Sequence, residues 1–440
     1  MVDTSDLLMD IGGEPLSCAL LSKVFGDAIS PSCEVVPGSE LKQAGSHTAM
    51  LRDVATQNHK VFLKKVTATF VANKAWNDRR RVLLYIRNEL RFYHEFAPLL
   101  RARGVAIPNT VHLKGHNLDG IEEFEETPPP AHLRCCGAML FIEPLSDAAR
   151  YEQCSPVTVQ QARLVLNAAA KLHAAALEDV PLLERAATRL QRNGGSFALT
   201  ARNPKELLEL TASWERFKLS FAPVAPSGFF EREEIASLGA RLQAAAPWIA
   251  EQLSPRPQDM WATLVHGDLK SMNVFLPVQL LISSGHAGEA GVEEAAGVAT
   301  GDAAVLIDFA STGVGFGMAD VAMHLVHALL PSDLDGGGEE ALLDAYLDAL
   351  AAARGADTVP YPRELALRHF RLGICDYGRF MMGRFWGAAS PESFARQADR
   401  PNVALMNRNL ASALRFVERL SQYLTHVESE RTCAAARVET

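Results

Sequence analysis

The hydrophobic pattern of this chain changes about a third of the way along its length. Up to about residue 145, short apolar runs of strand length alternate with polar turns around one helical stretch. From about residue 158 onward, apolar residues recur mostly at helical spacing. A chain of 440 residues also exceeds the size at which one hydrophobic core keeps growing. We therefore expect an α+β protein with two lobes, a small β-rich N-terminal lobe and a larger, mainly helical C-terminal lobe.

The N-terminal part is expected to contain five strands and one long helix. The helix is predicted over 77–100, where Leu83, Leu90 and Phe96 recur at helical spacing. Pro98 is expected to perturb the end of this helix, because proline lacks the N–H that a helix needs. The predicted strands are 33–36, 49–54, 59–66, 110–114 and 138–142.

The C-terminal part is expected to be helical except between residues 262 and 325, where short apolar strands flank sharp turns. Within that stretch, 283–301 is rich in Gly, Ala and Glu and is predicted to be a mobile insertion. The predicted helices are 158–177, 204–221, 231–253, 339–353, 362–386 and 402–427.

Composition excludes several classes of function. The formal net charge is −9, which argues against a nucleic-acid partner because binding phosphates needs a basic face. The seven cysteines show no regular spacing, so we expect reduced thiols and a cytoplasmic protein. No targeting segment and no apolar run of about 18 residues is visible, so no membrane association is expected. The oligomeric state has no signature in the sequence.

The segment 264–275, LVHGDLKSMNVF, carries the most specific chemical signal. Asp268 follows His266 and Gly267, and Asn273 stands five residues after it. Phosphoryl transfer needs a carboxylate near the attacking hydroxyl and oxygen ligands that hold Mg²⁺ on the nucleotide phosphates. A surface turn that happens to contain Asp and Asn would be the plainer interpretation of this spacing alone. The preceding His-Gly and the apolar flanks favour the catalytic interpretation.

A second acidic residue, Asp308, ends an apolar strand in the segment VLIDFASTGVGFGMADVA. A carboxylate at a strand end suits a further Mg²⁺ ligand, although a turn or helix-capping Asp is the alternative. The position of Asp308 downstream of Asp268 favours the metal-binding role.

These two motifs resemble those of the aminoglycoside phosphotransferase and choline kinase family, which has a protein-kinase-like fold. Protein kinases carry HRD where this chain has His266-Gly267-Asp268, and no APE segment follows Asp308. The segments 87–99 (RNELRFYHEFAPL) and 375–386 (CDYGRFMMGRFW) resemble elements of ecdysteroid-kinase-like (CHK-like) members. The resemblance covers roughly residues 30–390. It implies an N-terminal extension over 1–30, a nucleotide-binding lobe over 31–143, a catalytic and acceptor lobe over 144–430 and a tail over 431–440.

The resemblance implies ATP and Mg²⁺ as cofactors and assigns roles to residues that match its motifs. Asp268 would orient and deprotonate the acceptor hydroxyl, and Asn273 and Asp308 would bind Mg²⁺. Lys64 would contact the α- and β-phosphates, with Glu89 pairing with it.

Strand alternation supports Lys64 over its neighbour Lys65, because Lys64 and Phe62 then point to the same side of their strand. Lys65 stays open as the alternative. A solvated lysine on an edge strand is the plainer interpretation of either position.

Two further nucleotide contacts follow from the resemblance. The segment 141–145, FIEPL, falls where the hinge should be, so backbone groups near Glu143 and Leu145 would receive the adenine; a buried strand ending at Pro144 is the alternative. The loop over the phosphates should lie near 36–50, but it lacks the G-x-G-x-x-G pattern. Gly45 and Ser46 are candidates there, with ordinary turn residues as the other interpretation.

The acceptor is expected to be a small-molecule alcohol bound by helices after Asp308. Candidate contacts are Asp376, Tyr377, Arg379 and Trp386, although much of that helix could be core. Aromatic and acidic residues would suit a cationic acceptor such as choline or an amino sugar, whereas apolar walls would suit a steroid. The alternatives to a small-molecule kinase are a catalytically silent nucleotide-binding scaffold and a protein kinase.

Three other residues are expected to support the site rather than to react. Asp320 is predicted to be a structural carboxylate of the helical lobe, and His266 to hold its loop by hydrogen bonds. His173 is predicted to be a hydrogen-bonded core histidine.

Overall fold

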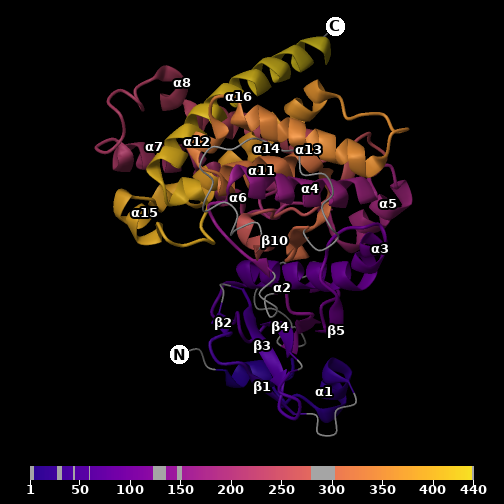
Figure 1. The fold of residues 1–440 in the computed structure, drawn as a ribbon. Coiled ribbons are helices and arrows are strands. Elements are labelled where there is room, and N and C mark those ends of the chain that lie inside the picture. The colour runs from indigo at the N-terminus through magenta and orange to yellow at the C-terminus, as the bar shows by residue number, and fades with distance from the viewer. Residues whose placement is uncertain are drawn as a thin grey trace, which may run out of the picture. The chain divides into compact units, whose positions relative to one another are not determined.

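The computed structural model describes residues 4–26, 32–42, 45–58, 60–121, 135–145, 151–278 and 303–438. The chain forms two compact units. Unit 1 comprises Met1–Tyr151 and the short segment Ile307–Ala310, and unit 2 comprises Glu152–Leu306 and Ser311–Thr440. The predicted insertion 283–301 lies outside the described residues. Strands dominate unit 1 and helices dominate unit 2, which confirms the predicted α+β class with a β-rich N-terminal part and a mainly helical C-terminal part (Figure 1).

Unit 1 is built on a six-stranded antiparallel sheet with the strand order β1-β3-β4-β6-β5, in which β2 also pairs with β3. The alternation predicted from the sequence is present from Lys60 to Lys65, where β4 buries every second residue; Val66 and Thr67 are buried as well. The elements of this unit are η1 (Ser5–Leu8), α1 (Cys18–Phe25), β1 (Cys33–Val35), β2 (Leu41–Lys42), β3 (His47–Asp53), β4 (Lys60–Thr67), α2 (Trp76–Arg91), η2 (Phe92–Phe96), α3 (Ala97–Ala102), β5 (Thr110–His116) and β6 (Gly137–Ile142).

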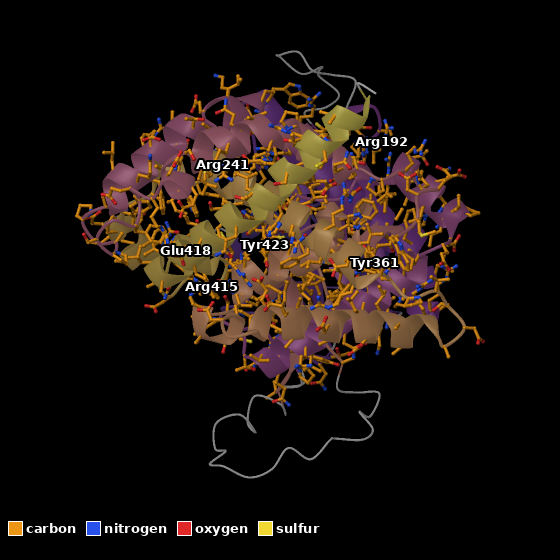
Figure 2. The ribbon with its side chains drawn as sticks, turned by 90° about the horizontal axis from the view of Figure 1, so that it is seen from above. Arg192, Arg241, Tyr361, Arg415, Glu418 and Tyr423 are labelled. Carbon is orange, nitrogen blue, oxygen red and sulfur yellow. The ribbon has the colours of Figure 1, made fainter. Side chains whose placement is uncertain are left out.

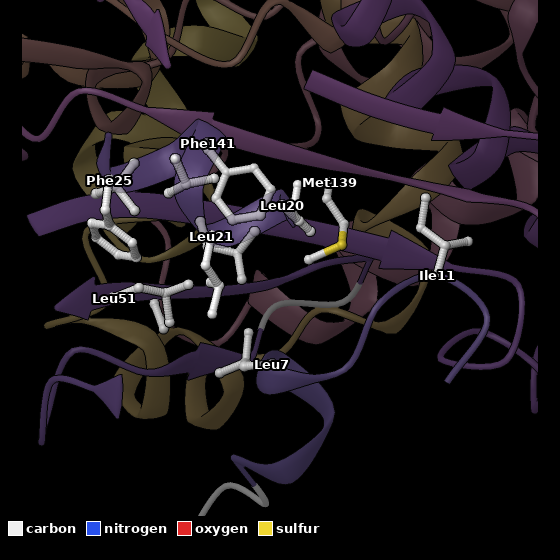
Figure 3. Packing of buried hydrophobic residues seen from close by; sticks show 12 residues of the cluster. Leu7, Ile11, Leu20, Leu21, Phe25, Leu51, Met139 and Phe141 are labelled. Atoms are coloured by element: carbon white, nitrogen blue, oxygen red, sulfur yellow. The ribbon is translucent and has the colours of Figure 1, made fainter. Parts of the chain in front are cut away.

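The N-terminal segment covers one face of this sheet. Leu7, Leu21 and Phe25 pack against sheet residues such as Leu51 and Phe141 in one buried apolar cluster (Figure 3). Burial of this cluster stabilises unit 1 in proportion to the apolar area removed from water. The segment is therefore part of the core of unit 1 rather than an appendage to it.

The long helix predicted over 77–100 is interrupted. It consists of the α-helix α2, one π-helical turn, η2, and a short helix, α3. Pro98 stands in the first turn of α3, where its missing N–H needs no helical partner. The wider π turn lies directly before that proline and buries Phe92, Tyr93 and Phe96.

Unit 2 is a helical assembly in which α4 packs against α13, and α14 packs against α11, α9 and α16. Its elements are α4 (Val159–Ala176), α5 (Val180–Arg189), β8 (Gln191–Asn193), η5 (Leu199–Ala201), α6 (Pro204–Leu208), α7 (Leu210–Phe221), α8 (Glu233–Ala236), α9 (Leu238–Gln252), β9 (Ala262–Val265), η6 (Ser271–Asn273), β10 (Val274–Pro277), β11 (Val305–Leu306), β12 (Gly313–Phe316), α11 (Gly317–Ala328), α12 (Pro331–Leu334), α13 (Gly338–Arg354), α14 (Arg363–Arg384), η8 (Trp386–Ala388), α15 (Pro391–Gln397), η9 (Leu405–Asn407) and α16 (Leu410–Val438). Two short elements, β7 (Tyr151–Glu152) and η7 (Phe309–Ser311), cross the division between the units.

Short strands in unit 2 position the loops between the helices. β12 lies between β8 and β9, and β10 pairs with β11. The loop from β9 to η6 contains the HGD motif, so both of its ends are anchored in strands or a tight turn.

The C-terminal helix α16 is tied to its neighbours by ion pairs. Arg241 on α9 pairs with Glu428 at 2.6 Å, and Arg415 pairs with Asp335 at 2.6 Å. Figure 2 labels Arg415 and Tyr423, which belong to this helix, and Arg241 of α9. Within the described ranges, no helix is long and apolar enough to cross a membrane.

Candidate active site

Asp268 lies at the centre of a hydrogen-bonded loop in unit 2. Its Oδ2 accepts from Asn273 Nδ2 at 3.1 Å and pairs with Lys270 Nζ at 3.1 Å, and its Oδ1 accepts from Ser196 Oγ at 3.2 Å. The side chain keeps about a fifth of its surface exposed. The carboxylate is therefore held in one orientation while part of it stays accessible, as a group that receives a proton from a bound hydroxyl must be.

The backbone at Gly267, where protein kinases carry arginine, favours glycine over any other residue. Its φ is +78°, a left-handed conformation that side chains disfavour. A Cβ atom at this position would lie 2.2 Å from the Ser311 carbonyl oxygen and 2.7 Å from the Gly195 nitrogen. The neighbouring loop approaches closely here, because the Ser196 N–H donates to the Gly267 carbonyl at 2.8 Å.

Asp320 holds the same loop from the side of α11. Its carboxylate accepts from the backbone N–H of His266 at 2.7 Å and of Gly267 at 2.9 Å. His173 lies 3.1 Å from the same carboxylate and 2.8 Å from the Tyr346 hydroxyl. Burial raises the pKa of Asp320, but hydrogen bonding to His173 and the charges of His173 and His266 outweigh it, so the net pKa is lowered. Asp320 and His173 are thus buried structural groups, as expected.

The orientation of Asn273 fits a metal ligand. Its Nδ2 donates to the Asp268 carbonyl oxygen at 2.8 Å as well as to the carboxylate, so its Oδ1 lies on the opposite side of the amide group. Amide and carboxylate oxygens such as those of Asn273 and Asp308 are the donors that Mg²⁺ prefers. In the part of the chain that the structure describes, no three His, Cys, Asp or Glu side chains form a ready-made metal cluster.

Lys64 lies between two carboxylates within unit 1. Its Nζ is 2.7 Å from Glu89 Oε2 on α2 and 2.8 Å from Asp308 Oδ1 in the segment Ile307–Ala310. The predicted Lys64–Glu89 pair is therefore present. Lys65 points to the opposite face of the sheet, where its Nζ donates to the carbonyl oxygens of Met9, at 2.8 Å, and Asp6.

Burial and charge act in opposite directions on this pair. Burial lowers the pKa of Lys64, but the charges of Asp308 and Glu89 outweigh it and raise the pKa, so the lysine stays protonated. Burial raises the pKa of Glu89 to about 7, against the lowering effect of Lys64. The Lys64 ammonium group is thus fixed by Glu89, which is buried, and by Asp308, which is partly exposed.

Asp308 is itself held by contacts that the sequence did not indicate. Its φ is +63°, an uncommon conformation in which Asp is better tolerated than most residues. Asn88 Nδ2 lies 3.1 Å from the Ala310 carbonyl oxygen and 3.3 Å from that of Phe309. The Phe309 ring stacks on Phe92 with centroids 3.9 Å apart. These contacts fix the two residues that directly follow Asp308.

The expected adenine and phosphate contacts also lie in unit 1. The Glu143 N–H donates to the Asn109 carbonyl at 2.9 Å, and Asn109 Nδ2 donates to the Glu143 carboxylate at 2.9 Å. Adenine contacts would therefore come from the Glu143 carbonyl or from Leu145, which directly follows Pro144. Ser46 is buried and Gly45 partly exposed, both directly before β3.

The four candidate acceptor contacts on and after α14 differ in their surroundings. Asp376 and Arg379 are buried and pair with each other at 2.6 Å. Tyr377 is buried, and burial together with the charge of Asp268 raises the pKa of its phenol. Trp386 is fully buried, stacks on Phe217 at 4.4 Å and donates to Asn407 at 2.7 Å. Trp386 therefore belongs to the aromatic core of unit 2.

The chain is similar to solved structures of small-molecule kinases. The match to a candidate aminoglycoside phosphotransferase from Ralstonia eutropha has a TM-score of 0.45 at 12% identity and covers 93% of this chain and 97% of that one. The match to an amicoumacin kinase, solved with AMP-PNP and Ca²⁺, has a TM-score of 0.42 at 10% identity and covers 88% and 90%. The match to choline kinase from Streptococcus pneumoniae has a TM-score of 0.39 at 13% identity and covers 89% and 94%.

No family model matches the sequence, and no curated protein matches it.

Proposed function

We propose that the protein is an ATP- and Mg²⁺-dependent phosphotransferase that phosphorylates a hydroxyl group of a small molecule. The observation that carries the proposal is the position of Lys64, 2.7 Å from Glu89 and 2.8 Å from Asp308. A buried lysine fixed by a helix carboxylate, next to a carboxylate suited to Mg²⁺, is an arrangement that phosphoryl transfer uses to hold nucleotide phosphates. The HGD loop supplies the remaining residue types in the matching order.

In this account, unit 1 binds the nucleotide. Lys64 would contact the α- and β-phosphate oxygens, and Glu89 would keep its ammonium group in place. Backbone groups of Glu143 and Leu145 would receive the adenine, and Gly45 and Ser46 would border the phosphates. Catalysis would depend chiefly on positioning and on neutralising phosphate charge.

The loop of unit 2 would supply the proton acceptor. Asp268 would accept the proton of the acceptor hydroxyl while the hydroxyl oxygen forms a bond to the γ-phosphorus. The bond from that phosphorus to the β,γ-bridging oxygen would break at the same time, and ADP would be released. Lys270 and Ser196 would hold the Asp268 carboxylate in place through their contacts of 3.1 and 3.2 Å. Asn273 and Asp308 would hold Mg²⁺, which supplies charge neutralisation at the phosphate oxygens.

The proposal is tested by ADP release with a panel of small alcohols, run in parallel on the wild type and on Asp268→Ala. We expect at least one alcohol to stimulate ADP release, and Asp268→Ala to reduce it at least about 1,000-fold while ATP binding is retained. ATP binding without turnover on any alcohol would instead indicate a nucleotide-binding scaffold. Transfer to protein substrates alone would indicate a protein kinase.

A further inference from the structure

Two carboxylates at and near Asp268 are each paired with a basic side chain. Asp268 itself pairs with Lys270 at 3.1 Å, and Asp376 pairs with Arg379 at 2.6 Å. Arg379 also donates to the Phe197 carbonyl, and Phe197 directly follows Ser196, which bonds to Asp268. Both ion pairs thus belong to one connected group of residues in unit 2.

A third carboxylate in this group, Glu206, is paired with two arginines. Arg202 makes two hydrogen bonds to it, at 2.7 and 2.9 Å, and Arg384 lies 3.6 Å away. The Arg202 guanidinium also lies 4.8 Å from the centre of the Phe380 ring. Arg202 and Glu206 are both largely buried, so their mutual neutralisation is weakly screened by solvent.

Aromatic rings connect the catalytic loop to the surface of unit 2. Phe197 lies 5.2 Å from Tyr377 and 6.2 Å from Phe380, and Phe380 lies 5.5 Å from Phe385. Phe380 is 9% exposed and Phe385 is 43% exposed. We call Phe197, Phe380 and Phe385 the aromatic row. It begins next to Ser196, the residue bonded to Asp268, and ends at an exposed ring.

The charge balance of this group disfavours a cationic ligand. Among the described residues, the ion pairs of this group join four basic side chains to three carboxylates, so these pairs leave no surplus of negative charge. A site that recognises ammonium groups needs carboxylates that are not already neutralised, or an aromatic cage without adjacent cations. Here each of these three carboxylates has a basic partner, and the Arg202 guanidinium already lies over the Phe380 ring of the row.

We propose that the acceptor is an uncharged alcohol whose apolar body lies against the aromatic row, and that cationic alcohols are poor acceptors. This inference rests on the proposed function, since the aromatic row gains its role from the neighbouring Asp268. The hydroxyl of the acceptor would meet Asp268, and its ring or branched chain would cover the exposed edges of Phe380 and Phe385. The charge balance separates this class from choline-like and amino-sugar acceptors.

The test compares alcohols of matched shape that differ in one charge. The pairs are 3,3-dimethylbutan-1-ol with choline, and trans-4-methylcyclohexanol with trans-4-aminocyclohexanol. Burying an uncompensated cation beside basic groups is costly, so we expect kcat/KM from ADP release to favour the neutral member of each pair by at least about tenfold. Equal values, or a preference for the cationic member, would overturn the inference.

Two variants test whether the aromatic row and its charges determine this preference. Phe385→Ala should raise KM for the neutral alcohols by roughly five- to tenfold and leave kcat within about twofold. Met260→Ala, which truncates another exposed apolar side chain of unit 2, is the matched control and should leave KM unchanged. Arg384→Glu should move the preference toward the cationic members by about fivefold, whereas Arg256→Glu should not. An unchanged KM for the neutral alcohols in Phe385→Ala would contradict the proposal that the aromatic row binds the acceptor.

Failure of this inference can be told apart from failure of the proposed function. If no alcohol of either charge stimulates ADP release, the phosphotransferase assignment fails. Binding of the same pairs is then measured by saturation-transfer NMR on the wild type and on Phe385→Ala. Preferential binding of the neutral members, weakened in the variant, would support the aromatic row as a binding surface. Absence of binding by the neutral alcohols would overturn the inference as well.

Discussion

The Asp320 carboxylate accepts a hydrogen bond of 2.9 Å from the backbone N–H of Gly267, the residue before Asp268. A second bond, of 2.7 Å, comes from the N–H of His266. One buried side chain therefore fixes two consecutive peptide groups of the HGD loop, and His173 in turn fixes that side chain. Asp268 depends for its position on a carboxylate that takes no part in the proposed chemistry.

Asp320→Asn should destabilise the protein and reduce turnover. Loss of a buried charge with three partners should lower the free energy of unfolding by about 2 to 4 kcal/mol at pH 7. The pKa of Asp320 is lowered in the folded state, so its stabilisation is present above the pKa of about 4 in the unfolded chain and is lost as pH falls through the folded value. Urea unfolding from pH 7 to pH 3 should show this difference shrinking below about pH 4. Asp259→Asn, at a more exposed site, is the control, and an equal loss there would contradict the account.

Gly267→Ala should abolish activity through the backbone. The added Cβ would lie 2.2 Å from the Ser311 carbonyl oxygen, so the two loops must move apart. Gly228→Ala is a matched control, because Gly228 has a φ of +75° and no atom within 4 Å of the added Cβ. The control should lose about 1 kcal/mol of unfolding free energy and keep its activity. Equal losses of activity in both variants would show that the close approach has no functional role.

Lys64→Met and Lys65→Met should separate nucleotide binding from folding, although the two lysines are adjacent. Lys64→Met should lower kcat/KM for ATP by at least about 100-fold, because Lys64 is the proposed phosphate contact. Lys65→Met should lower the thermal unfolding midpoint, because it removes the contacts to the Asp6 and Met9 carbonyls, and should leave the KM for ATP within about threefold. Steady-state kinetics and thermal unfolding check both results. A larger effect of Lys65→Met on ATP kinetics would reverse the assignment.

Glu89→Gln should change how stability depends on pH. The pKa of Glu89 is about 7 in the folded state and 4.5 ordinarily, so the folded state binds more protons between these values. Stability of the wild type should therefore fall relative to Glu89→Gln as pH rises from about 4.5 to about 7, by about 1 to 3 kcal/mol. Urea unfolding without nucleotide or Mg²⁺ would measure it. A relative gain in wild-type stability over this range would contradict the burial effect on Glu89.

Ser196→Ala should slow the chemical step without weakening nucleotide binding. Ser196 donates to Asp268 Oδ1 at 3.2 Å, and a hydrogen bond to a charged group contributes about 1.5 to 3 kcal/mol. We expect kcat to fall by about 10- to 100-fold with the KM for ATP unchanged, and Ser196→Thr to restore most of the rate. A rise in the KM for ATP at unchanged kcat would show that Ser196 does not position Asp268.

Much of unit 1 could be predicted because its signals are local. Strand alternation in 59–66 places Lys64 and Lys65 on opposite faces, and the structure has Lys64 beside Glu89 and Lys65 beside the N-terminal segment. The sequence did not indicate that this segment packs on the sheet. Such packing depends on contacts between residues far apart in the chain, which periodicity does not encode.

The contacts around Asp268 could be predicted only in part. The spacing from Asp268 to Asn273 is local and carried a specific signal, and the structure joins the two by a 3.1 Å hydrogen bond. Ser196 was missed because 72 residues separate it from Asp268 and no motif surrounds it. Trp386, at the end of the segment 375–386, is predicted as an acceptor contact but lies in the aromatic core, because position along a helix alone does not distinguish a core aromatic residue from one that lines a site.

The helix predicted over 204–221 is broken into α6 and α7 at Glu209, although its apolar spacing is continuous. Glu209 has φ −90° and ψ 3°, outside the helical region. Hydrophobic spacing indicates which face of a helix is buried. The spacing stays the same when the backbone changes direction slightly between two helices. The spacing therefore could not show where one helix ends and the next begins.

The most direct test of the account follows the γ-phosphoryl group of ATP under single-turnover conditions. The enzyme is mixed with [γ-³²P]ATP, Mg²⁺ and the best alcohol from the panel, and the labelled products of the wild type and Asp268→Ala are compared. The account predicts that the wild type transfers the label to the alcohol as a phosphate monoester, whereas Asp268→Ala leaves it in bound ATP. Label transferred equally by both proteins, or found only in inorganic phosphate or on protein, would contradict it.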